Sequence, residues 1–95
     1  MLARMDGALR DNAVLGRFEL DFDGGQGIVT YRRAGQVVTL LHAEVPPLLA
    51  GRGHGSALVR ATLEHLRAEG ARIVPVCSFV ARYIERHPEY RTLLA

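Results

Sequence analysis

The segment LLAGRGHGSALV, residues 48–59, places glycines at alternate positions, Gly51, Gly53 and Gly55, directly before an apolar run of helical period. Glycine adopts backbone conformations that other residues avoid and lets another molecule approach the backbone closely. A helix that begins here presents unpaired N–H groups and the positive end of its dipole. The segment therefore predicts either an anion site, with phosphate as the simplest ligand, or a strand-to-helix turn that binds nothing.

Three polar side chains of this segment could add donors around a phosphate: Arg52, His54 and Ser56. A nucleoside-triphosphate loop needs a lysine followed by Ser or Thr after its last glycine, and the chain contains no lysine. A dinucleotide-binding turn belongs early in a parallel unit. Neither of these two phosphate-binding motifs fits the segment.

Upstream of the glycines, the sequence shows the period-two alternation of antiparallel strands. In the run 16–24, Phe18, Leu20 and Phe22 lie on one face and charged side chains on the other. The letters DGGQG at 23–27 predict a hairpin turn into a second strand at 27–35. The third strand, 36–45, is more continuously apolar, which predicts that it is covered on both faces.

From Gly55 the period becomes helical, with a stripe formed by Val59, Thr62, Leu63 and Leu66. Gly70 is expected to end this helix. The run RIVPVC, 72–77, then predicts a strand parallel to the third strand, because a right-handed helical crossover returns the chain in that direction.

Ser78 is expected to cap a second helix, FVARYIER at 79–86, which Pro88 ends. The residues after Pro88 add one more turn or strand. The predicted fold class is α/β (α+β): a mixed central sheet in which an antiparallel meander precedes a β-α-β unit and a C-terminal helix.

Composition limits the function classes. Ninety-five residues predict a single domain, 1–95, and no apolar run approaches the roughly 20 residues of a membrane span. The amino-terminal letters lack a signal-peptide apolar region, so we expect a cytoplasmic protein. Cys77 is the single cysteine, which excludes an internal disulfide, and the lack of a close Cys/His pair predicts no metal ligation. The twelve arginines are dispersed, which argues against nucleic acid as a partner.

Two motifs resemble a known family. GRGHGSALV at 51–59, after HAEVPP at 42–47, resembles the acetyl-coenzyme A loop of the GNAT-type N-acetyltransferase superfamily, whose pattern is Arg or Gln, two residues, Gly, one residue, Gly or Ala. HAEVPP with CSFVARYIERHPEY at 77–90 resembles its small single-domain branch. The resemblance covers about residues 15–92. It implies a GNAT-like sheet, acetyl-coenzyme A as acetyl donor, and a small-molecule or protein amine as acceptor.

The resemblance also implies site residues. Coenzyme A would contact Val45, Gly51, Arg52, Gly53, His54, Gly55, Ser56 and Cys77. In this fold the pantetheine arm lies where two parallel strands separate, and Pro75 is consistent with such a separation because it cannot donate to a ladder. Arg82, Arg86 and His87 could reach the adenosine phosphates or remain solvated charges.

Four residues are candidates for the chemistry. His42 and Glu44 are two apart in a strand and share a face, so either could take a proton from the attacking amine; the resemblance favours Glu44. It also implies that Tyr83 protonates the leaving thiolate. Cys77 precedes a helix, whose amino terminus favours the thiolate form. It could be a nucleophile, a wall of the thioester pocket or a small buried side chain, and direct transfer is the default mechanism.

The sequence also departs from the superfamily. Ala50 stands where the first Arg or Gln of the loop is expected, and Arg52 could take over part of that role. The chain has no room for the helices that usually enclose the acceptor, so the acceptor site is either open or completed by a second subunit. A monomer and a homodimer both stay open. Two alternatives to an enzyme also remain: a non-catalytic coenzyme A-binding module, and a phosphate- or nucleic-acid-binding domain.

Overall fold

The computed structural model describes residues 8–95; residues 1–7, part of the segment expected to lack a signal peptide, lie outside the described residues. Five strands form one sheet in chain order: β1 (Arg10–Asn12), β2 (Arg17–Phe22), β3 (Gly25–Ala34), β4 (Val37–Glu44) and β5 (Arg72–Pro75). The first four pair antiparallel, and β4 pairs with β5 in parallel. This confirms the predicted meander and β-α-β unit, with β1 as one strand more than the alternation indicated.

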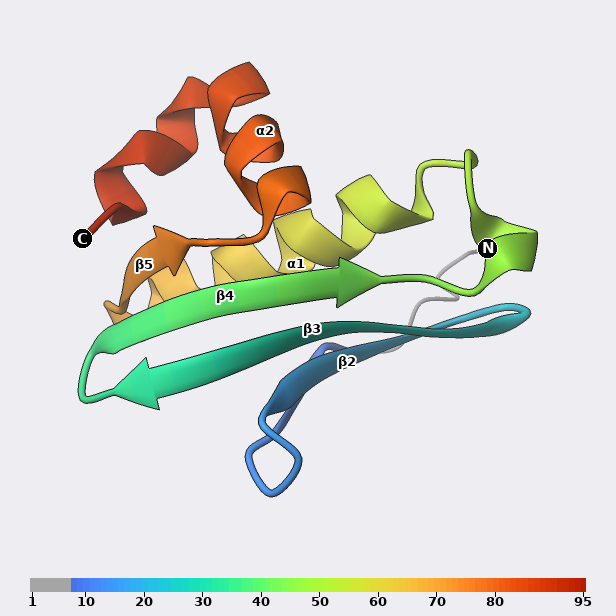
Figure 1. The fold of residues 1–95 in the computed structure, drawn as a ribbon, viewed down its shortest axis with the longest axis horizontal. Helices are drawn as coiled ribbons and strands as arrows, with labels where there is room; N and C mark the ends of the chain where they lie inside the picture. The colour runs from blue at the N-terminus through green and yellow to red at the C-terminus, as the bar shows by residue number, and fades with distance from the viewer. Residues whose placement is uncertain (1–7) are drawn as a thin grey trace.

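The helices lie on one side of the sheet and at one edge. Helix α1 (His54–Glu69) crosses behind the sheet, and α2 (Ser78–Arg86) and the 3-10 helix η2 (Pro88–Leu93) lie beyond the β5 edge (Figure 1). A short 3-10 helix, η1 (Pro47–Leu49), precedes the glycine loop. The chain end returns to the edge strand, where the Ala95 N–H donates to the Ile73 carbonyl oxygen at 2.9 Å. The tail after Pro88 thus makes both a helical turn and a strand-like contact.

The core lies between the sheet and α1. The predicted stripe of α1 is buried throughout, with Leu58 beside it. Phe18, Leu20 and Phe22 of β2 are buried against this helix layer, as the alternation predicted. The burial of this apolar surface holds the helices against the sheet.

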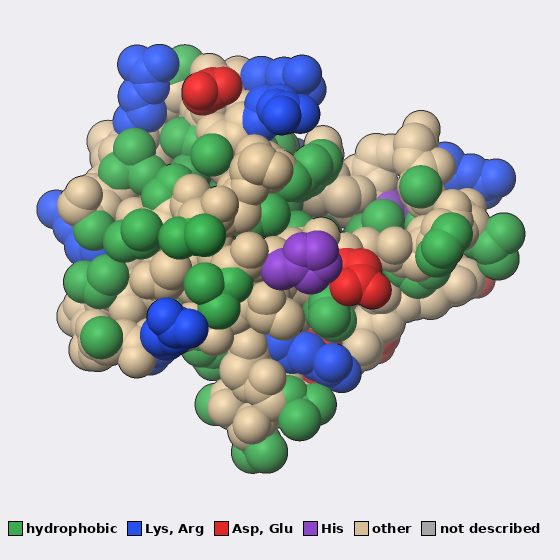
Figure 2. Space-filling model, viewed as in Figure 1, with side chains coloured by type: hydrophobic (Ala, Val, Ile, Leu, Met, Phe, Trp, Pro, Cys, Tyr) green, Lys and Arg blue, Asp and Glu red, His purple; other side chains and the backbone are tan. Residues whose placement is uncertain are grey.

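The prediction that the third strand is covered on both faces is wrong. In β4 the side chains alternate as far as Leu40, with Val38 and Leu40 fully buried and Val37 exposed. Leu41 has no partner in β3, and this bulge reverses the alternation, so that His42 and Glu44 lie on the same side as Val37. We call the side opposite α1 the open face; its exposed residues include Val37, His42, Glu44 and Val74. Figure 2 shows this side, where hydrophobic side chains gather over β5 and the adjoining part of α2. Among residues 8–95, α1 crosses behind the sheet, and α2 and η2 lie beyond the β5 edge, so none of these three helices covers the open face.

The start of α2 also differs from the prediction. Ser78 is the first helical residue, and Cys77 occupies the cap position, where no side chain accepts a hydrogen bond from the helix. The end matches, because α2 stops at Arg86 and His87 leaves helical geometry before Pro88. Within the described part of the chain, no helix is long and apolar enough to cross a membrane.

The packing of α1 predicts how the stability depends on its buried face. Leu63 is fully buried, so Leu63→Ala should lower the free energy of unfolding by about 2–5 kcal/mol. Leu48 in η1 is 79% exposed, and Leu48→Ala should change the free energy of unfolding by less than about 0.5 kcal/mol. Urea denaturation followed by circular dichroism measures both. Equal losses for the two variants would contradict the assignment of α1 to the core.

Candidate functional site

The parallel strands β4 and β5 separate partway along β4. Their ladder ends at the pair of Leu40 with Pro75, whereas β4 continues to Glu44. Pro75 has no N–H to extend the ladder. The Cys77 N–H still donates to the Leu40 carbonyl oxygen at 2.9 Å, and the chain then turns into α2 (Figure 1). The separation expected from Pro75 is therefore present, and it opens the sheet beside the second half of β4.

The glycine loop leaves the amino terminus of α1 bare. Gly51 and Gly53 have φ angles of 77° and 84°, and a Cβ atom on either would meet nothing within 4 Å. Gly53 is the cap residue and no side chain caps the helix. The first intrahelical bond runs from the Ala57 N–H to the Gly53 carbonyl oxygen. The N–H groups of residues 54–56 thus lack intrahelical partners, and together with the helix dipole they suit an anion.

The side chains of the loop divide into two groups. Arg52 and Ser56 are exposed, so both are free to approach a ligand. The His54 ring turns inward: its Nδ1 lies 3.2 Å from the Leu49 carbonyl oxygen, and the ring meets Phe22 edge-on at 4.7 Å. His54 therefore fastens the loop to β2, and its contribution to an anion site is the backbone N–H.

Three adjoining hollows lie along the loop, the end of β4 and α2. An apolar cavity of about 120 Å³ is lined by Ala43, Glu44, Val45, Gly55, Leu58 and Phe79. A hollow against the loop is lined by Val45, Ala50, Gly51, Gly53, Gly55, Ser56 and Phe79. A more polar hollow is lined by Ser56, Phe79, Arg82, Tyr83, Arg86 and His87. All three adjoin at Phe79, and we call them together the depression.

Phe79 is the residue of this site that sequence reasoning missed. It lies in the first turn of α2 and is 42% exposed, and its ring faces Gly55, where a Cβ atom would come within 3.1 Å of Phe79 Cζ. The available signal was a large aromatic side chain directly after the predicted Ser78 cap. Its contact with α1 depends on how the two helices pack, which local sequence does not report.

His42 and Glu44 lie together at the end of β4. The distance from His42 Nε2 to Glu44 Oε1 is 3.2 Å, and their side chains are 61% and 62% exposed on the open face. This confirms that the two residues share a face. Glu44 also lines the apolar cavity, so it borders the depression, with His42 beside it on the open face of the sheet.

Cys77 and Tyr83 lie on the α2 side. Cys77 is buried at the start of α2, tied to β4 through its backbone bond to Leu40. Tyr83 is buried with its ring stacked on His87 at 4.0 Å. Burial raises the pKa of the Tyr83 hydroxyl, which therefore keeps its proton at neutral pH. Glu44 and Tyr83 line different hollows, with Phe79 common to both.

The comparisons with known proteins point to one family. A family model described as GCN5-related N-acetyl-transferase matches residues 17–93. The NMR solution structure of a GCN5-like protein from Staphylococcus aureus is similar to this chain, with a TM-score of 0.63 and 26% sequence identity. The similarity covers 84% of this chain and 81% of that chain. The mixed sheet with its helices is thus a GNAT-like fold, as the two motifs indicated.

The left-handed conformation of Gly53 at the amino terminus of α1 leads to a stability prediction. Gly53→Ala should lower the free energy of unfolding by about 1–2 kcal/mol, because a Cβ atom is strained at a φ of 84° although the space around it is open. Ser56→Ala, an exposed position in the first turn of the same helix, serves as control and should change it by less than about 0.5 kcal/mol. Urea denaturation measures both, and equal stabilities would contradict the described loop conformation.

Proposed function

Because the chain belongs to the GCN5-related N-acetyltransferase family, we propose that it transfers an acetyl group from acetyl-coenzyme A to an amine. The acceptor is a small amine or an exposed amino group. The observation that carries the proposal is the bare helix terminus at the glycine loop, which opens into an apolar cavity where β4 and β5 separate. An anion site beside an apolar channel suits a ligand with a pyrophosphate and a long neutral arm.

The residues present fit coenzyme A. The loop offers N–H groups in residues 54–56 and open space at Gly51 and Gly53, so a pyrophosphate can approach the backbone. Arg52 and Ser56 add exposed donors, and Arg52 stands two positions from Ala50, where the family pattern has Arg or Gln. The neighbouring cavity, with Val45 on its wall, would take the apolar arm. When bound, acetyl-coenzyme A supplies the acetyl group as an activated thioester.

The proton chemistry is assigned to the exposed end of β4. An amine is mostly an ammonium at neutral pH and must lose a proton before it can attack. Glu44 is proposed as the acceptor of that proton, with His42 hydrogen-bonded to it at 3.2 Å as partner or alternative base. Both face the open side of the sheet, so the acceptor amine would arrive from there. A second subunit could complete that side of the site.

The α2 side is assigned the opposite proton step. The buried Tyr83 hydroxyl keeps its proton at neutral pH and is therefore suited to donate it to a leaving thiolate. Cys77 is buried and lines none of the three hollows described above, which supports a small buried side chain and a direct transfer. A nucleophilic Cys77 is the alternative, and it predicts a covalent acetyl-enzyme.

A binding test needs no knowledge of the acceptor. Acetyl-coenzyme A at 100 times its Kd should add about 2.7 kcal/mol to the stability, which raises the unfolding midpoint by on the order of 10 °C. ATP and NAD at the same concentration should have little effect. Ser56→Glu should reduce the shift by placing a negative charge at the helix terminus, while the uncharged Ser56→Gln should retain it. No shift at millimolar acetyl-coenzyme A would overturn the proposed donor.

A turnover test separates the enzyme from a binding module. With a panel of amines and labelled acetyl-coenzyme A, Glu44→Gln should lower kcat about 100-fold or more while leaving the thermal shift intact, because general base catalysis contributes about that much. Asp23→Asn, an exposed carboxylate in the β2–β3 turn, is the matched control. Cys77→Ala should retain turnover if Cys77 is a wall and abolish it if it is the nucleophile. Absence of turnover with every amine would favour the non-catalytic coenzyme A-binding module.

A further inference from the structure

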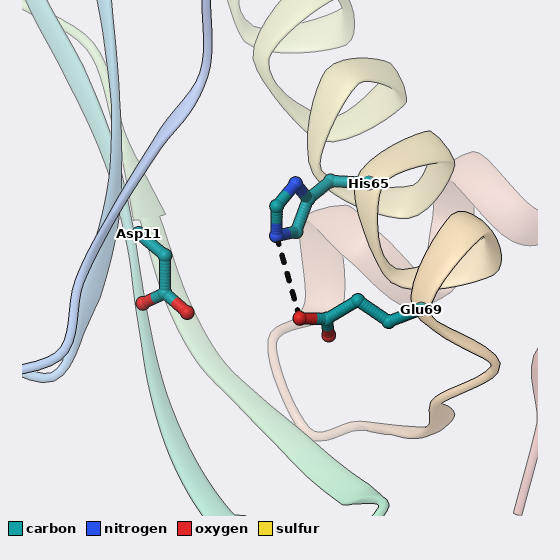
Figure 3. A group of neighbouring side chains, drawn as sticks. All are labelled: Asp11, His65 and Glu69. Carbon is teal, nitrogen blue, oxygen red and sulfur yellow. Dashed lines mark ion pairs between the residues drawn. The ribbon is translucent and has the colours of Figure 1, made fainter.

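A second cluster of chemically active side chains lies away from the glycine loop, on the carboxyl-terminal half of α1. Figure 3 shows His65 and Glu69, one turn apart on this helix, facing Asp11 of β1. One ligand atom from each residue lies within 4.8 Å of the others, and His65 Nε2 is 3.7 Å from Glu69 Oε2. An imidazole and two carboxylates converge on one point between the helix and the sheet.

Neighbouring side chains hold one oxygen of each carboxylate. The Tyr31 hydroxyl donates to Asp11 Oδ1, and Arg33 donates to Glu69 Oε1 at 2.8 Å. Among residues 8–95 the structure records no hydrogen bond to Asp11 Oδ2, and Glu69 Oε2 faces His65. Such outer partners orient ligands in known metal sites.

The His65 ring is also held in place. It packs edge-on against the buried Phe18 at 5.5 Å, which fixes the ring while leaving the side chain about one third exposed. Nε2 points toward the carboxylates in Figure 3. The imidazole is therefore presented to the cluster and does not need to be ordered by a ligand.

We propose that Asp11, His65 and Glu69 bind a divalent transition metal ion, with zinc as the best fit. Zinc accepts imidazole nitrogen and carboxylate oxygen at about 2.0–2.2 Å, so tetrahedral ligand atoms lie roughly 3.4 Å apart. The ligand atoms, which lie up to 4.8 Å apart, must approach one another by at most about 1.4 Å, and rotation of the exposed Asp11 and Glu69 side chains can supply this. Water would complete the coordination.

The chemistry of the cluster selects among metals. Magnesium and calcium prefer six or more oxygen ligands, whereas an imidazole favours zinc, nickel or cobalt. The two carboxylates provide two negative charges, and Arg33 offsets one of them. A divalent cation would therefore relieve the remaining repulsion between the carboxylates and would join β1 to α1, two segments far apart in the chain.

This inference is independent of the proposed acetyl transfer, and it departs from the sequence-based expectation of no metal ligation. That expectation rested on the lack of a close Cys/His pair. The spacing of His65 and Glu69, four apart on one helix face, was the signal present in the sequence, but Asp11 joins them only through the pairing of β1 with β2.

Thermal unfolding of the EDTA-treated protein with added zinc chloride tests the site. Zinc should raise the unfolding midpoint of the unaltered chain by several degrees, and His65→Gln or Glu69→Gln should weaken zinc binding at least tenfold. Glu85→Gln removes an exposed carboxylate of α2 and should leave the zinc response unchanged. His42 and Glu44 are another exposed pair able to attract zinc, so His42→Gln is a second control and should likewise leave the zinc response unchanged. An unchanged response in His65→Gln would overturn the proposal.

A measurement on the unaltered chain covers the case in which His65→Gln fails to fold. In ¹⁵N-edited NMR of the imidazole groups, zinc at a stoichiometric amount should move the His65 resonances and leave those of His87 in place. Movement of the His42 signals without His65, or no movement at millimolar zinc, would show that the cluster is an ion-pair network without a metal.

Discussion

The pairing of β4 with β5 is the constraint on which the rest of the structure depends. It is the one parallel pair of the described sheet, so the chain between the two strands must cross from one end of the sheet to the other, and α1 makes that crossing. The glycine loop lies where the crossing begins, and α2 begins where it ends. Because the ladder stops at Leu40 and Pro75, both helix starts lie beside the part of β4 that has no partner on this side.

Local sequence predicted the parts of this arrangement that follow from period and backbone restriction. The alternation around Phe18 predicted β2, the stripe through Leu63 predicted α1, and Pro75 predicted the separation of the strands. Each of these features depends on interactions within a few residues, or on a conformation that one residue type forbids. The two motifs around the glycines and after Cys77 added the family, which the family model confirms.

The rest depended on contacts between segments that are distant in the sequence. Phe79 becomes part of the depression because α2 packs its first turn against Gly55. His54 faces the core because the Leu49 carbonyl and Phe22 are within its reach, although its position in the loop suggested a phosphate donor. The continuous apolar character of β4 suggested two covered faces, yet the chain places its helices on one side and at the β5 edge. No local pattern records such partners.

The two ends of α1 show how one helix can serve both binding and stability. Its first turn carries no acidic residue and no capping side chain, whereas a Ser, Thr, Asp or Asn cap would contribute about 1 kcal/mol. Its second half makes several polar interactions. Arg67 places a positive charge in the last turn, where the helix dipole is negative, Glu64 accepts a hydrogen bond from the Tyr90 hydroxyl, and Glu69 pairs with Arg33. The helix thus gains its stability from the buried face and the second half, which leaves the N–H groups at its start available to an anion.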